Sequence, residues 1–465
     1  MKKSLIFAVS LVIALVLSAC AGGGGAAGGG GAAAPAGDGG GQEAAADDAP
    51  AAAADGEEMT VTVMFFESGI PGGPVHAVTG EPSVVLTEMH PEIFARTPNV
   101  TWEFEALVGG TDGFNAYLLR GAAGTLPDIS MLDGYWVPAF ASLGYTTPLE
   151  DVLPSGLIDL YYPAFRAMYD GRTHGLVMAT QFNGVLWYRR SHMEEQGLTM
   201  PPASWDELRR YAAALTIPDE RYGLVMSLAR TESTTVSLLG FYWASGREFV
   251  DTNNVAQFHN QTSIDLFYLI RDMFNDGSLP AGSLTMGYPD VERLFVTEMA
   301  SILMHGGWLS HGWEARAPDF ADDIGLSPLP VYGPTGITSQ NAGGWGLSVT
   351  TQDSSKFPAI TEFFNVFLFE PEWATRRIRE SGEIPVVTNI PRDDVDWIPE
   401  EFVGILMDIL PYSNTRPTVA VYPDASMIYT EAMQEVVTGM SDADSALARA
   451  VEEVARVAYE SGWAR

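Results

Sequence analysis

DGRTHGLVMATQFNGVLWYRRSHMEEQGLTMPPASWDEL, residues 170–208, is the stretch around which the rest of this chain is organised. Two apolar runs, 175–179 and 185–188, flank the polar tip TQFNG, which has no reason to be buried. Short apolar runs bounded by turn residues predict strands. A capping box at Ser204 and Glu207 predicts the start of a helix. We therefore expect strand, polar tip, strand and helix in this order.

Length, charge and cysteine content narrow the class of protein. The 465 residues allow two or three ordinary domains with full hydrophobic cores. The only cysteine is Cys20, which excludes an intramolecular disulfide and a cysteine-based zinc cluster. A formal net charge of −34 repels phosphate backbones. We therefore expect no nucleic-acid partner.

The first residues predict an exported protein. A start with two lysines and an apolar run at 5–17, too short to span a membrane as a mature helix, precede Leu-Ser-Ala-Cys ending at Cys20. This arrangement resembles the bacterial lipobox, which implies a signal peptide at 1–19 and a lipid on Cys20 that anchors the protein at the extracytoplasmic face of the cell membrane. Residues 20–59 are mainly Gly, Ala and acidic residues, and we expect a flexible tether.

The residues after the tether alternate between strand and helix patterns. Strands are predicted at 60–66, 100–104 and 128–132, with helical patterns between them. Connections of that length indicate an open α/β sheet, in which ligands bind beyond the carboxyl ends of the strands. The residues that follow those ends are polar or aromatic. Among them we select Glu67, Ser68, Asp133 and Trp136 as candidate ligand contacts.

Tryptophan is frequent, with eleven in the chain, and several lie beside glycines at strand ends. Trp308 follows two glycines, and so does Trp345, which comes directly after Gly344. Glycine allows the backbone to approach a ligand, and an indole offers a flat face to the C–H side of a sugar ring. The alternative is a core aromatic packed under a glycine turn. Trp136 and Trp243 each follow another aromatic residue and are weaker candidates.

Several polar residues have the chemistry to bind sugar hydroxyls. Glu67, Asp133, Gln181 and Asn183 supply acceptors and donors, although Asp133 could equally cap a helix or make a turn. The seven histidines include no HExxH motif, so we expect neither a metal nor a cofactor. Ser310 and His311 do not fit GxSxG, and we expect no enzyme activity.

Several blocks together resemble the extracellular solute-binding proteins, family 1 and sugar-type, of bacterial ABC importers. They occur in the family's order and extend over nearly everything from Thr60 to the end. The blocks are FARTPNVTWEFE, LPDISMLDGYWVPAFASLGYTTPLEDVL, the opening stretch, MASILMHGGW, IGLSPLPVYGPTG, FFNVFLFEPEWATRRIRESGEIPVVTN, and RPTVAVYPDA followed by GMSDADSALARAV. The loop at 69–83 is longer than the family's usual loop, which leaves its part in the cleft open.

The resemblance implies an α/β, two-lobed periplasmic-binding-protein-like fold of type II. Each lobe has a mixed sheet flanked by helices, and the ligand cleft lies between the lobes. It also implies that Arg416 and Tyr422, on a block that faces the cleft in the family, contact ligand. The implied bounds are 60–181 and 309–368 for lobe 1, 185–304 and 371–465 for lobe 2, and hinge crossings near 181–184, 305–308 and 367–371.

The function implied is that of a lipid-anchored monomer that binds a sugar or oligosaccharide by cleft closure. The protein would then deliver the ligand to a membrane permease driven by a cytoplasmic ATPase. Two alternatives stay open. A polyamine or other cation could bind to Glu67, Asp133 and the tryptophans as an anionic aromatic cage, and a surface glycan hydrolase is less favoured.

Overall fold

The computed structural model describes residues 57–74, 82–333, 339–391 and 395–463. The predicted signal peptide, Cys20 and most of the tether lie outside these residues. Within them, no helix combines the length and the apolar character needed to cross a membrane.

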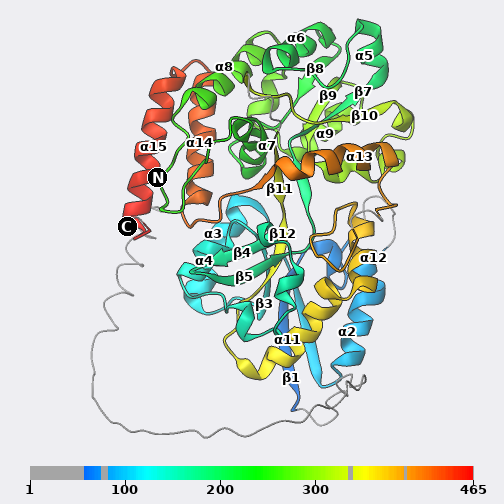
Figure 1. Ribbon diagram of the computed structural model, residues 1–465, viewed down its shortest axis with the longest axis vertical. Helices are drawn as coiled ribbons and strands as arrows, with labels where there is room; N and C mark the ends of the chain where they lie inside the picture. Colours follow the sequence, from blue (N-terminus) through cyan, green and yellow to red (C-terminus); the bar gives the residue numbers. More distant parts are fainter. Residues whose placement is uncertain (1–56, 75–81, 334–338, 392–394, 464–465) are drawn as a thin grey trace, which may run out of the picture. The chain divides into compact units, whose positions relative to one another are not determined.

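A six-stranded mixed sheet contains the predicted N-terminal strands, in the order β2-β1-β3-β12-β5-β4 (Figure 1). β1 pairs in parallel with β2 and β3, whereas β12 is antiparallel to β3 and β5. Every residue of β3 is buried, including the polar Ser130 and Asp133, as in a strand that is covered on both faces. The strands are β1 (Met59–Phe65), β2 (Val100–Ala106), β3 (Ile129–Asp133), β4 (Arg166–Tyr169), β5 (Arg172–Val177) and β12 (Trp345–Val349).

A four-stranded sheet has the order β10-β7-β9-β8. Its strands are β7 (Val185–Arg189), β8 (Tyr222–Val225), β9 (Ala300–His305) and β10 (Ile324–Ser327). β10 pairs antiparallel with β7, so residues 324–327 lie with this sheet, not with lobe 1 as expected from the sequence. The chain therefore returns to this sheet after the expected crossing at 305–308. A short buried strand does not reveal in its own sequence which sheet it joins.

A three-stranded sheet connects the other two, in the order β13-β11-β6. β6 (Gln181–Asn183) lies between β5 and β7 in the chain, and β11 (Gln340–Gly343) lies between β10 and β12. β13 (Ser413–Thr415) completes this sheet, and Figure 1 shows β11 running between the two larger sheets. The polar tip of the opening stretch is therefore β6, one of the connecting strands.

The segment after β12 also differs from the predicted bounds. α12 (Pro371–Ser381) lies next to the six-stranded sheet, because Arg377 donates to the Met178 carbonyl at 2.8 Å. Ile384 and Val387 then bridge to Thr180 and Tyr161. Residues 371–387 thus stay with the first sheet, although the sequence interpretation assigned them to lobe 2. The next helix, α13 (Glu400–Ile409), contacts β10.

Helices cover both larger sheets (Figure 1). The predicted N-cap forms at the start of α6, where Ser204 accepts a hydrogen bond from the Glu207 amide at 3.2 Å. The second bond of the predicted capping box differs: the Glu207 carboxylate accepts from the amide of Ala203, one residue before the N-cap, at 2.6 Å. α14 packs against α7, α8 and α15. The remaining helices are α2 (His90–Arg96), α3 (Gly110–Ala123), α4 (Val137–Ser142), α5 (Arg190–Gln196), α6 (Trp205–Leu215), α7 (Glu232–Trp243), α8 (Gln261–Asn275), α9 (Tyr288–Val296), α10 (Trp313–Arg316), α11 (Phe357–Phe364), α14 (Tyr422–Val437) and α15 (Ala443–Glu460).

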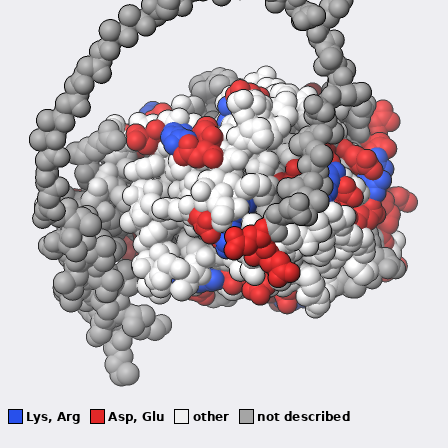
Figure 2. All heavy atoms as spheres, turned by 90° about the horizontal axis from the view of Figure 1, so that it is seen from below, with Lys and Arg blue, Asp and Glu red and all other residues white. Residues whose placement is uncertain are grey.

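The acidic balance of the sequence is visible on the surface. On the face drawn in Figure 2, carboxylate side chains gather in clusters, and the basic side chains lie beside them. Among the ion pairs of the molecule, Arg96 pairs with Glu92 at 2.8 Å and also binds Glu370.

Candidate functional site

Several predicted residues meet at the edge of the six-stranded sheet where the parallel strands β1 and β3 end and the antiparallel strand β12 begins. Asp133, the last residue of β3, pairs in register with Trp345, the first residue of β12. The Gly134 amide donates to the Gly344 carbonyl at 3.2 Å. Just beyond β1, the ring of Phe66 lies edge-on to Trp345, with centroids 5.4 Å apart. The rule that ligand sites form at this edge of an α/β sheet predicts this grouping.

Three charged side chains, Asp133, Glu232 and Arg416, form what we call the charged cluster. Arg416 binds both carboxylate oxygens of Asp133, one of them at 3.1 Å. Its Nη1 also lies 3.3 Å from a Glu232 oxygen. All three side chains are buried. The cluster joins the end of β3 in the six-stranded sheet, the start of helix α7 and the segment after β13 of the three-stranded sheet.

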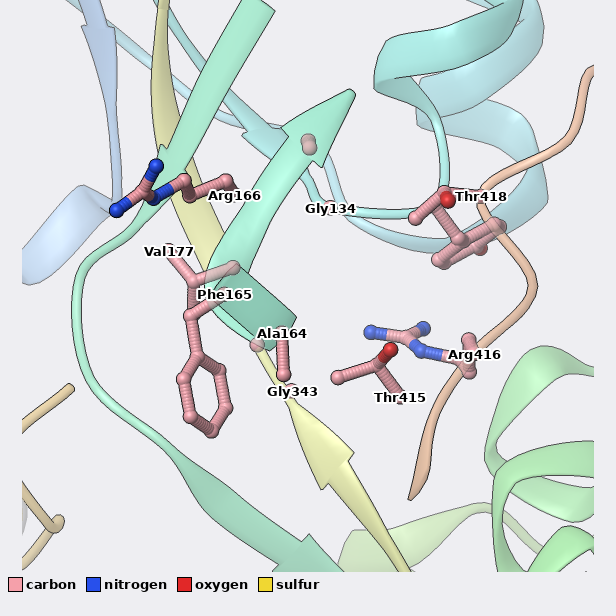
Figure 3. Close-up of a pocket in the computed structure, with 12 residues that line it drawn as sticks. Gly134, Ala164, Phe165, Arg166, Val177, Gly343, Thr415, Arg416 and Thr418 are labelled. Carbon is pink, nitrogen blue, oxygen red and sulfur yellow. The ribbon is translucent and has the colours of Figure 1, made fainter. Parts of the chain in front are cut away.

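The charged cluster is satisfied by its own members and their neighbours. Tyr422 donates to Glu232 at 2.8 Å, Ser426 donates to the other Glu232 oxygen, and the Arg416 guanidinium lies 4.3 Å from the centre of the Tyr135 ring. Burial raises the pKa of the Glu232 carboxyl, although Arg416 opposes this shift. The cavity beside Arg416 measures about 20 Å³, which is room for a single water molecule at most. Figure 3 shows Arg416 and Thr415 reaching into it from the coil at the right.

Asn183, Tyr288, His305 and Trp308 form a second group, the aromatic–amide cluster. The Tyr288 hydroxyl donates to the Asn183 side-chain oxygen at 3.3 Å. The Tyr288 ring lies 4.4 Å from that of His305 and 5.5 Å from that of Trp308. These residues come from β6, α9, the end of β9 and the turn after it. Trp308 and Tyr288 are half-buried, so this cluster is partly accessible to solvent.

The aromatic–amide cluster also contains buried polar atoms that lack partners. Within the described ranges, neither ring nitrogen of His305 has a hydrogen-bond partner. The same holds for both amide atoms of Asn341, which pairs with Asn183 across β11 and β6. Burial lowers the pKa of His305 to about 3, so its imidazole is neutral at physiological pH. Native proteins rarely leave such groups unpaired, and those that do often use them at functional sites.

Two of the predicted tryptophans lie in the core. Trp136 is fully buried and packs against Phe114 and Trp345, with ring centroids 5.7 and 5.2 Å away. Trp243 is the last residue of α7, at the opposite end from Glu232, and is buried as well. This corrects the sequence interpretation, which placed both indoles on the ligand side. A tryptophan beside another aromatic residue packs inward here in both cases.

The other predicted residues fall into distinct places. Glu67 is exposed, whereas Ser68 and Trp345 line a cavity of about 150 Å³. Gly344 lines the small cavity beside Arg416. Tyr422 is fully buried and holds Glu232 instead of facing solvent. Gln181 contributes its backbone to β6, but its side chain lies outside the described part of the structure.

Sequence reasoning missed Glu232, Tyr288, His305 and Asn341. No motif marks them, and each acquires its role from contacts with residues far away in the chain. The nearest sequence signal is an acidic residue, Glu232, at the start of a long apolar helix. Across the described residues, no group of three or more His, Cys, Asp or Glu side chains is arranged to hold a metal ion.

Comparisons with known proteins agree with this architecture. The sequence model of the bacterial extracellular solute-binding proteins matches residues 79–374. The chain is 22% identical over 402 residues to the sn-glycerol-3-phosphate-binding periplasmic protein UgpB of Rhizobium meliloti, which covers 81% of this chain and 91% of that one. It is 24% identical over 315 residues to the maltotriose-binding protein of Pyrococcus abyssi, covering 66% of this chain and 65% of that one.

Among solved structures, the maltose-bound MalE3 of T. maritima superposes with a TM-score of 0.71 and 19% identity, covering 86% of this chain and 100% of that one. This likeness, together with the mixed sheets flanked by helices, confirms the two-lobed α/β fold predicted from the sequence.

Proposed function

Because the chain belongs to the bacterial extracellular solute-binding protein family, we propose that it is the substrate-binding protein of an ABC importer for a neutral sugar or oligosaccharide. It binds the ligand by closing the two lobes over it and delivers it to the permease without changing it chemically. The protein acts as a monomer, and a lipid on Cys20 holds it at the membrane. The lipobox supports this anchor, and the tether of 20–59 supplies the reach.

The observation that carries the proposal is the aromatic–amide cluster. Trp308 offers a half-buried indole face, and Asn183 and His305 offer polar atoms beside it. A flat apolar face with a few fixed polar groups is the chemistry that binds sugar rings. The connecting strand β6 supplies Asn183, while the four-stranded sheet and its turn supply His305 and Trp308. A ligand held here contacts β6, which connects the two larger sheets, and the lobe that contains the four-stranded sheet. Its binding is therefore coupled to closure of the lobes.

The charged cluster weakens the polyamine alternative. A cation cage would need Asp133 to be free, but Asp133 accepts two hydrogen bonds from Arg416. Arg416 also neutralises part of the charge of Glu232. The remaining candidate, Glu67, is exposed to solvent, where a single carboxylate attracts a cation weakly.

A thermal-shift screen tests the proposal, because a ligand that binds only the folded state raises the melting temperature. The panel contains neutral mono- and oligosaccharides, spermidine and glycerol 3-phosphate. We expect a shift with at least one neutral sugar and none with spermidine. A shift with spermidine alone would replace the sugar assignment, and release of products from an oligosaccharide would replace the transport assignment. Mass spectrometry of the membrane-bound protein, with Cys20→Ala as control, tests the anchor.

A further inference from the structure

A cavity of about 780 Å³ lies beside Ser310 and His311, two residues that the proposed sugar site does not use; we call it the second cavity. Small-molecule sites in proteins measure about 300–1,000 Å³, so this volume is sufficient for a ligand. No residue that lines the second cavity belongs to the charged cluster or to the aromatic–amide cluster. The second cavity is therefore built from residues that have no part in the proposed sugar site.

Segments packed on both larger sheets form the walls of the second cavity. One wall is the turn into α10 together with the start of α13. The ring of Trp313 in α10 lies 5.2 Å from that of Trp187 in β7, and α13 contacts β10. The other wall is residues 395–398, where the Trp397 indole donates to the Glu383 carbonyl at 3.0 Å, in the segment that stays with the six-stranded sheet. The second cavity thus lies between segments that pack on different sheets.

Two neutral side chains offer hydrogen-bond acceptors at the second cavity. Ser310 is 1% exposed, and its hydroxyl has no hydrogen-bond partner in the part of the chain that the structure describes. Buried hydroxyls of this kind are uncommon in native proteins and call for an explanation. His311 donates from Nδ1 to the Trp397 carbonyl at 3.3 Å, so Nε2 of its neutral form is an acceptor. Both groups can therefore accept from a ligand that donates.

Three carboxylates, those of Glu314, Asp396 and Glu400, add negative charge to the lining of the second cavity. Asp396 is already paired with Arg379, at 2.7 Å. Within the described ranges, Glu314 and Glu400 have no basic side chain within 4.0 Å, and no lysine or arginine lines the second cavity. Two uncompensated carboxylates therefore attract a cation to it.

Arg379 shows which kind of cation these surroundings accept. Its guanidinium pairs with Asp396 and lies 5.5 Å from the centre of the Trp397 ring. A guanidinium is flat, carries five N–H donors in a fixed plane and has no acceptor, so it can stack on an indole and bind a carboxylate through two parallel hydrogen bonds. An ammonium group has no flat face. Because the free groups of the second cavity are acceptors, they match a guanidinium.

We propose that the second cavity binds a small guanidinium compound, whose N–H groups donate to Glu314, Glu400 and Ser310. The apolar side chains of Ile398 and Val403, which also line the second cavity, cover the carbon chain of the ligand. Spermidine carries only ammonium groups and lacks the flat set of donors, so it is not a ligand of this site. The inference does not depend on which sugar binds at the aromatic–amide cluster.

Isothermal titration of the full protein with agmatine tests this site. Cadaverine is the matched probe, because it is a dication of similar length with an ammonium group at both ends. We expect agmatine to bind severalfold more tightly than cadaverine. Equal binding of the two would show only the general attraction of an acidic surface and would overturn the proposal. An N-acetylated Gly-Arg-Gly amide that binds more tightly than agmatine would assign the site to an arginine of a partner protein, and would overturn the small-molecule ligand.

Substitutions in the lining locate the binding. Glu314 and Glu400 are exposed, so Glu314→Gln and Glu400→Gln leave the fold intact. We expect each to weaken agmatine severalfold and the double variant to weaken it roughly tenfold, as the loss of two exposed ion pairs does. Glu401→Gln is the matched control, because Glu401 is the next residue on α13 but pairs with Arg190 at 2.5 Å and does not line the second cavity. Equal losses in Glu400→Gln and Glu401→Gln would contradict the site.

The failure of this inference and the failure of the proposed function can be told apart. Trp308→Ala should leave agmatine binding unchanged while it lowers the affinity for sugar. If wild type binds a sugar but not agmatine, the second cavity is not a guanidinium site and the proposed function stands. If wild type binds agmatine and the lining variants weaken it, the inference stands whether or not any sugar in the screen binds.

Discussion

The charged cluster and the aromatic–amide cluster both lie where the sheets meet, yet they are built in opposite ways. Arg416 uses its donors on Asp133 and Glu232, and Tyr422 and Ser426 complete the shell of Glu232. In the aromatic–amide cluster, the side chain of His305 has no hydrogen-bond partner within the described residues, and neither has that of Asn341, which pairs with Asn183 across the strands. Closed sets of hydrogen bonds stabilise a structure, whereas unpaired buried groups cost stability. We therefore infer that the first cluster serves folding and lobe contact, and the second serves the ligand.

The largest expected effect comes from removing the cation of the charged cluster. Arg416→Met leaves two buried carboxylates uncompensated, and breaking such a pair costs about 3–5 kcal/mol. Urea denaturation measures this loss. Arg449→Met is the control, because the Arg449 ion pair with Glu435 is solvent-exposed, where such pairs contribute about 0–1 kcal/mol. Equal losses in the two variants would show that the charged cluster does not stabilise the fold.

Removing the indole of the aromatic–amide cluster should lower the affinity for the sugar instead of the stability of the fold. Trp308→Ala is expected to cost about 2 kcal/mol of binding free energy, or roughly 30-fold in Kd, as truncation of a central aromatic contact does. Titration calorimetry with the sugar found in the screen measures it. Trp373, half-buried on α12, offers the matched variant Trp373→Ala, which should bind normally. Unchanged affinity in Trp308→Ala would remove this cluster from the site.

The buried neutral imidazole of His305 should make the free energy of unfolding depend on pH. Its pKa is about 3 in the folded protein and about 6.5 when unfolded, so the unfolded state binds more protons between these values. The stability that the neutral His305 imidazole contributes to the folded state is fully present above pH 6.5 and is lost as the pH falls toward 3. At pH 5.5 the loss is about 1.4 kcal/mol. His305→Phe should reduce the drop in unfolding free energy between pH 7.5 and 5.5 by that amount. An identical drop in both proteins contradicts the buried neutral imidazole.

The smallest effect on stability is expected at Asn341. Replacing an unpaired buried amide by an apolar side chain of similar shape is nearly neutral. Asn341→Leu should therefore unfold within about 0.5 kcal/mol of wild type, the range of changes that break no interaction. The affinity of this variant for sugar should fall, because the unpaired amide is expected to hydrogen-bond to the ligand. A clear loss of stability with normal affinity would show that Asn341 serves folding, as the charged cluster does, and not the ligand.

Local patterns in the sequence predicted the elements and part of the site. The strands predicted at 60–66 and 128–132 are β1 and β3, and Ser204 caps α6 where expected. Asp133, Trp308 and Trp345 were selected because they follow strand ends or glycines, and Asn183 because its amide can bind sugar hydroxyls. The same rule misplaced Trp136 and Trp243. It describes position along a strand and not the direction in which a side chain packs.

The sequence by itself determined the strands, the helix starts and the family, since these depend on neighbours within a few residues or on blocks in a fixed order. Only the tertiary structure decided that β10 joins β7 and that Arg416 meets Asp133 and Glu232, which lie 283 and 184 residues away in the chain. Strand pairing and buried ion pairs depend on which surfaces remain to be covered once the other elements have packed. No local pattern of residues contains that information.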